Sequence, residues 1–130
     1  MCGWWSTKQI IAHLASFEHW LVDILNEQLG EAPGPTLKRM RELGGGGFND
    51  IEVAERDGWT PQAVLDDYTG TAAENQALIA RIPVADRRRA GSLTWYGAEY
   101  DLEDFIVYSF YGHKREHTSQ VNVFLDRLRP

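Results

Sequence analysis

Two histidines and a glutamine near the C-terminus have a spacing that suits metal chemistry. His113, His117 and Gln120 are separated by four and three positions. On an α-helix such residues share one side, with Cβ atoms about 6 Å apart. Neutral imidazole is a good ligand for divalent transition metals, and two imidazoles one turn apart supply half of a four-coordinate site. Lys114 follows His113, so the pair lacks the glutamate base of the metalloprotease motif.

A third histidine comes from the N-terminal part of the chain. His13 lies on the apolar face of a predicted helix, and His113 and His117 interrupt the apolar face of a C-terminal helix predicted over Leu102–Leu128. A polar group on a buried face costs free energy unless it is paired. Three imidazoles on two inner faces favour a metal site with one position left for water or substrate. Core histidines satisfied by hydrogen bonds are the alternative.

The other polar residues near this motif give no assigned catalytic group. Gln120 has two possible roles: it can orient His117 as a metal ligand, or it can hydrogen-bond to a neighbouring helix. Glu116 lies off the ligand face, so we assign no general base and leave the catalytic residues unknown. His19 lies on the opposite side of its helix from His13, and we predict it to be a solvated surface histidine.

The N-terminal half of the chain shows clear helix signals. Ser6 and Gln9 form a predicted capping box for a helix that ends near Leu29, before Gly30. A short helix is predicted over 35–43, where a run of four glycines ends it, and a second short helix is predicted over 48–56.

The second half supplies two more long helices. Thr60 is a predicted N-cap with Pro61 at the first helical position, and Asp101 is the predicted cap of the last helix. A loop is expected over 84–100. The core face of the middle helix is predicted to consist of Leu65, Tyr68, Ala72, Leu78, Ile79 and Ile82. Three long helices with short connecting helices predict an all-α up-down bundle, formed by residues 1–130 as a single domain.

Composition excludes several classes of function. The net charge of −6 argues against binding of a nucleic-acid backbone, which requires a basic surface. We find no apolar run of membrane length and no signal peptide, so we expect a cytoplasmic protein without a membrane partner. Cys2 is the single cysteine, which excludes an intramolecular disulfide and a cysteine-based metal cluster.

Two motifs resemble the DinB-like, or YfiT-like, superfamily. The segment from Trp5 to Leu14, WSTKQIIAHL, is similar to the opening Trp-Ser…His motif of that superfamily. The segment from His113 to Gln120, HKREHTSQ, is similar to its closing His-x-x-x-His-x-x-Gln motif. Both motifs occur in the family's order, and the resemblance covers nearly the whole chain.

The resemblance implies a four-helix bundle that is often dimeric, with a divalent metal (Zn, Ni or Fe) on His13, His113 and His117. It also implies a small-molecule substrate and use of a low-molecular-weight thiol, because members include thiol S-transferases, thiol-dependent isomerases and metal-dependent hydrolases. Relatives have a whole helix before the Trp-Ser motif, whereas four residues precede Trp5 here. We therefore expect the first bundle helix to be missing or supplied by a partner chain.

Two functions remain open from the sequence. The first is a metal-dependent transferase or hydrolase in which a bound thiol or water becomes the nucleophile. The second is a non-catalytic helical module, for binding or stress response, with structural or vestigial histidines. A homodimer formed through the groove that the missing helix leaves is a further expectation.

Overall fold

The computed structural model describes residues 5–130, and this part of the chain is helical with no strand. The predicted all-α bundle class is confirmed. Contacts divide the chain into two compact units, Met1–Arg81 and Ile82–Pro130, which are described separately. The organisation of residues 1–130 as a single domain stays a prediction, and Cys2 lies outside the described residues.

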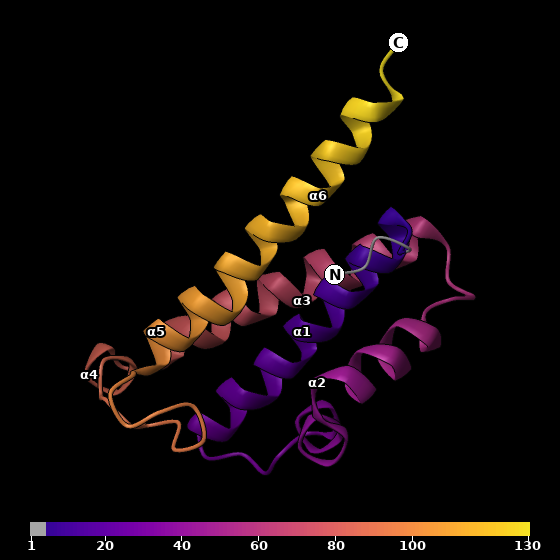
Figure 1. Cartoon of the computed structure of the whole chain (residues 1–130). Coiled ribbons are helices and arrows are strands. Elements are labelled where there is room, and N and C mark those ends of the chain that lie inside the picture. Colours follow the sequence, from indigo (N-terminus) through magenta and orange to yellow (C-terminus); the bar gives the residue numbers. More distant parts are fainter. Residues whose placement is uncertain (1–4) are drawn as a thin grey trace. The chain divides into compact units, whose positions relative to one another are not determined.

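Helix α1 (Thr7–Gln28) forms the centre of the first unit and packs against both α2 and α3 (Figure 1). Its start is as predicted, since the Ser6 side chain accepts from the Gln9 amide and the Gln9 side chain accepts from the Ser6 amide. Gly30, with a φ of 93°, follows its last turn. Ile24 and Leu25 are almost completely buried, which places the apolar face of α1 in the core of the unit.

Helix α2 (Pro35–Glu55) consists of two helical segments that meet at Gly44. Gly44 has φ 68° and ψ 174°, a conformation that side-chain-bearing residues rarely adopt. The two short helices predicted on either side of the glycine run are thus confirmed, although glycines 45–47 are themselves helical. The second segment buries Phe48 completely, and its ring meets that of Phe17 on α1.

Helix α3 (Pro61–Arg81) begins as predicted, because the Thr60 hydroxyl accepts from the Ala63 amide at 3.1 Å. Its predicted core face was wrong by one position at the start, since Leu65 is exposed and Val64 is buried. The buried residues of the helix are Val64, Thr71, Asn75 and Leu78. Asn75 is compatible with a core position because its amide donates to the Glu18 carboxylate (2.6 Å) and to the Glu18 carbonyl (2.9 Å).

The second unit holds a short helix, a loop and one long helical rod. Helix α4 (Val84–Arg87) corrects the prediction of a loop over 84–100 at its start. The rod comprises α5 (Leu102–Ile106), a π-helical turn η1 (Val107–Tyr111) and α6 (Gly112–Leu128), which follow one another without a break (Figure 1). Asp101 caps it as predicted, in a capping box with Asp104.

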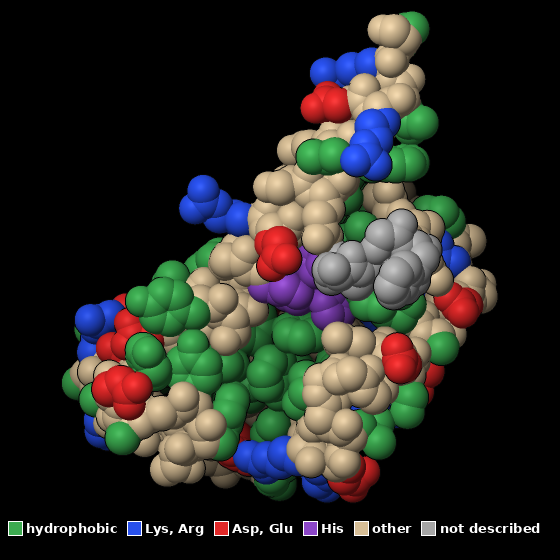
Figure 2. Space-filling model, in the orientation of Figure 1, with side chains coloured by type: hydrophobic (Ala, Val, Ile, Leu, Met, Phe, Trp, Pro, Cys, Tyr) green, Lys and Arg blue, Asp and Glu red, His purple; other side chains and the backbone are tan. Residues whose placement is uncertain are grey.

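The rod is buried at its start and exposed at its end. Phe105 and Phe110 are buried, and their rings lie 5.4 Å apart. Phe124 and Leu128 share the apolar face of the helix that the sequence predicts over Leu102–Leu128, but they are 52% and 64% exposed. Within its own unit α6 continues directly from η1, and hydrophobic side chains are visible at the surface along its C-terminal end (Figure 2).

No helix in the described part of the chain is both long enough and apolar enough to cross a membrane.

Candidate metal centre

His113 and His117 meet on the first turns of α6. Their Nε2 atoms lie 2.8 Å apart, and their ring centroids lie 4.5 Å apart. His117 is 1% exposed and His113 is partly buried, so the pair is largely shielded from bulk water. The i and i+4 spacing therefore brings the Nε2 atoms of the two imidazoles together, as the sequence predicts.

Gln120 fixes the orientation of one member of the pair. Its Oε1 lies 3.0 Å from Nδ1 of His117. An amide oxygen can only accept, so Nδ1 of His117 carries a proton, and in the neutral imidazole Nε2 is left as an acceptor. A neutral His117 then accepts in the 2.8 Å contact, and His113 donates through Nε2. Gln120 thus holds His117 in the tautomer that a metal ligand requires.

His113 is held in the neutral form. Burial, with a smaller contribution from the neighbouring His117, lowers the pKa of the His113 imidazole to about 4 from the usual 6.5. A neutral imidazole can release its Nε2 position to a metal by moving the proton to Nδ1, whereas an imidazolium cannot bind a metal.

The π-helical turn η1 sets the face on which the pair lies. A π turn contains one residue more than an α-helical turn, so it rotates every residue that follows it around the helix axis. Such turns occur often at functional sites. Here η1 ends at Tyr111, two residues before His113, and Phe110 anchors it in the core.

His13 is the predicted ligand that lies in the first unit. It is 3% exposed, and its ring packs against those of Trp5 and Phe17, with centroids 5.1 and 4.8 Å away. The backbone carbonyl of His13 accepts from the Ser16 hydroxyl at 2.6 Å. His13 is thus a buried residue of α1, on the inner face that the sequence predicts.

The profile of one family, described as the mycothiol maleylpyruvate isomerase N-terminal domain, matches residues 1–103. The chain belongs to this family. The family is part of the DinB/YfiT-like superfamily of helical metal-binding proteins, which confirms the resemblance noted in the sequence. Comparisons with curated proteins and with solved structures give no match.

The donor chemistry of this member of the mycothiol maleylpyruvate isomerase N-terminal domain family fits a transition metal. The three predicted ligands are His13 in the first unit and His113 and His117 in the second, and each of them is buried or partly buried. All three are imidazoles, and Gln120 orients one of them through its second nitrogen, as is usual at metal sites. The identity of the metal does not follow from this donor set, since imidazole suits Zn, Ni and Fe.

The surroundings of His19 in this family member differ from the sequence prediction. His19 is not simply solvated, because its Nε2 lies 2.7 Å from the Asp67 carboxylate and 3.3 Å from the Thr71 hydroxyl. Its side chain is 36% exposed. The partners lie about fifty positions away on α3, so no local pattern around His19 could have indicated the pair.

Proposed function

We propose that the chain is a divalent-metal-dependent enzyme of the DinB-like type that acts on a small molecule. His13, His113 and His117 hold the metal, and Gln120 keeps His117 in the ligating tautomer. The observation that carries the proposal is the convergence of the two Nε2 atoms, 2.8 Å apart, with the outer nitrogen of His117 bound to an amide oxygen.

The chemistry follows from the donor set. A divalent metal on three imidazoles lowers the pKa of a bound thiol or water, so that a nucleophile is available at neutral pH. The residues of the chain keep the ligands neutral, orient them and shield them from bulk water. No protein general base is needed for this role, which agrees with the lack of an assigned base near the pair.

We further propose a low-molecular-weight thiol as the nucleophile. The family description names mycothiol and an isomerase, and the resemblance noted in the sequence implies thiol-dependent isomerases and S-transferases among the members of the superfamily. A hydrolase-like reaction, with water in place of the thiol, uses the same donor set.

Metal content tests the proposal. Protein purified without a nickel column is analysed for Zn, Ni and Fe in four forms: wild type, His113→Ala, His117→Ala and His19→Ala. About one equivalent of metal is expected in wild type and in the control His19→Ala, and none in the other two variants. Absence of metal from wild type, even after soaking in Zn or Ni, refutes the proposal. Calorimetric titration of mycothiol into the metal-loaded protein then tests the thiol.

A non-catalytic helical module is the second candidate. It is favoured by the hydrogen bonds that the buried His117 imidazole makes through both of its nitrogens, to Gln120 and to His113, without a metal. It predicts a folded, metal-free protein whose thermal midpoint does not respond to a chelator. The metal enzyme instead loses stability when the metal is removed, because a ligand that binds only the folded state stabilises it.

A further inference from the structure

A pocket of about 360 Å³ lies in the first unit, formed by α1, α2, α3 and the segment between α2 and α3. None of the three proposed metal ligands lines it. Its walls are mainly charged side chains, together with the indole of Trp59. The volume lies at the lower end of the range usual for small-molecule sites, and the charged lining indicates a polar ligand.

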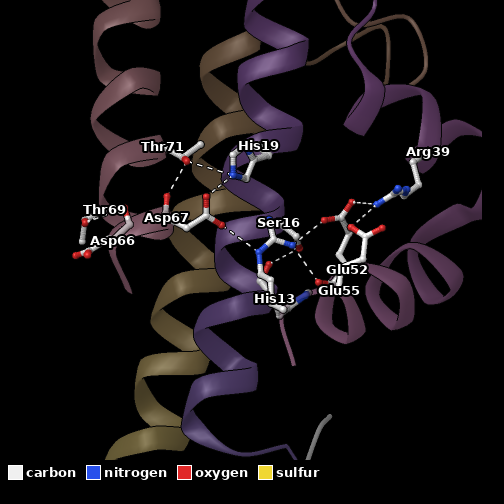
Figure 3. A network of polar contacts seen from close by, with 11 residues as sticks. His13, Ser16, His19, Arg39, Glu52, Glu55, Asp66, Asp67, Thr69 and Thr71 are labelled. Carbon is white, nitrogen blue, oxygen red and sulfur yellow. Dashed lines mark hydrogen bonds and ion pairs between the residues drawn. The ribbon is translucent and has the colours of Figure 1, made fainter. Parts of the chain in front are cut away.

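One wall of the pocket, called the inner wall here, is an ion network of four residues: Glu52, Arg56, Asp67 and His19. Arg56, with 7% of its side chain exposed, donates to the Glu52 carboxylate (2.8 Å), to the Glu52 carbonyl (3.0 Å) and to the Asp67 carboxylate (3.0 Å). Asp67 in turn pairs with His19. Figure 3 shows His19 of α1, Glu52 of α2 and Asp67 of α3 in this network. Each oxygen of the Glu52 and Asp67 carboxylates already accepts a hydrogen bond, so the inner wall offers little to a further donor.

The outer wall of the pocket is formed by Arg39 and Glu55. It differs because only one oxygen of the Glu55 carboxylate accepts a hydrogen bond from a described residue. Arg39 Nη1 donates to Glu52 at 2.7 Å and to Glu55 at 3.0 Å, in the latter case to Oε2. Among the described residues, no group donates to Oε1 of Glu55. The Glu55 side chain is 52% exposed, so this oxygen is the open acceptor of the pocket.

The balance of charge favours a cation. Three carboxylates (Glu52, Glu55, Asp67) and two guanidinium groups (Arg39, Arg56) line the pocket, which leaves one net negative charge before His19 is counted. The anion-binding capacity of the start of α2, which also lines the pocket, is reduced, because the Leu37 amide already donates to the Asp23 carboxylate at 2.9 Å. Gly34 makes room for that carboxylate, since a Cβ at Gly34 would overlap with it.

Trp59 supplies the second half of a cation site. It is 42% exposed, so part of the indole is open to a ligand beside the Arg56 guanidinium, which lies 5.4 Å from the centre of the ring. Trp59 follows Glu55 by four residues, and both line the pocket. We propose that the pocket binds a small organic cation, an ammonium or guanidinium compound, between the Glu55 carboxylate and the Trp59 indole.

Two-dimensional ¹H–¹⁵N NMR of the full chain tests this binding. The probes are butylammonium chloride and methylguanidinium chloride, and the anion control is sodium acetate at the same ionic strength. We expect saturable shifts of the Trp59 indole N–H and of the Glu55 and Arg56 amides with the cations. Glu55→Gln and Trp59→Leu each weaken binding by about two- to fivefold, the range for one partly exposed ion pair or cation–π contact.

Glu42→Gln is the matched control. It removes one negative charge from an exposed position on the same helix but outside the pocket, and binding should stay as in wild type. Because Glu42, Glu55 and Trp59 are all exposed, the three variants are expected to fold. The proposal is overturned if neither cation gives a saturable shift, if Glu55→Gln binds as tightly as Glu42→Gln, or if acetate binds these residues more tightly than the cations.

Discussion

Nδ1 of His117 lies 3.0 Å from Oε1 of Gln120, so the glutamine determines which nitrogen of the histidine faces His113. Gln120→Leu removes that acceptor while keeping a side chain of similar size. We expect metal affinity to fall about 10- to 100-fold, as is typical when the partner of a ligating histidine is lost. Competition with a chromophoric chelator measures the affinity.

The matched control for this prediction is Asn122→Leu, an exposed amide on the same helix. Gln120→Glu should restore affinity, because a carboxylate oxygen also accepts from Nδ1. If Gln120→Leu binds metal as wild type does, Gln120 has only a structural role.

The pKa of His113 predicts the pH dependence of the metal-free protein. It is lowered to about 4 in the folded state, first by burial and then by His117, against 6.5 in the unfolded chain. The unfolded state therefore binds the proton more readily between these values, and stability is lost as the pH falls from 6.5 to 4. Denaturant unfolding of chelator-treated protein at several pH values measures this loss.

The His113→Leu variant isolates this contribution from those of other titrating groups. The difference in unfolding free energy between wild type and variant should vary with pH between 4 and 6.5 and be constant above 7. A difference that is the same at pH 5 and pH 7 contradicts the assignment.

The sequence predicted the helix starts well because capping is local. Ser6 with Gln9, Thr60 and Asp101 each satisfy amides within three residues, so neighbouring residue types are sufficient to identify them. The inner faces of the first helix and the His113–His117 pair followed from periodicity in the same way.

The failures have non-local causes. The core face of α3 was misassigned because Asn75 is buried through hydrogen bonds to Glu18, and no hydrophobic pattern marks such a residue. The π turn at Val107–Tyr111 has no marker in its sequence VYSFY. The exposure of Phe124 depends on which elements lie beside α6, and periodicity shows only that the helix is amphipathic.

The exposed end of α6 suggests how two chains associate. Val123, Phe124, Leu125 and Leu128 are each about half exposed or more, and clustered apolar side chains on a surface often mark an interface. We expect a homodimer, with a mass in solution twice that of the 14.8 kDa chain. Light scattering after size exclusion at micromolar concentration measures it. Phe124→Glu with Leu128→Glu should give monomers, and a monomeric wild type would refute the dimer.

Two adjacent glycines in α2 should respond to alanine in opposite directions. Gly44 has φ 68° and ψ 174°, so Gly44→Ala is strained even though the space around it is open. We expect a loss of about 1–3 kcal/mol in unfolding free energy. Gly45 is helical and also has open space, so Gly45→Ala should gain about 0.5–1 kcal/mol by restricting the unfolded chain. Urea unfolding of both variants measures the two effects, and a gain in Gly44→Ala would mean that the kink at this residue is absent in solution.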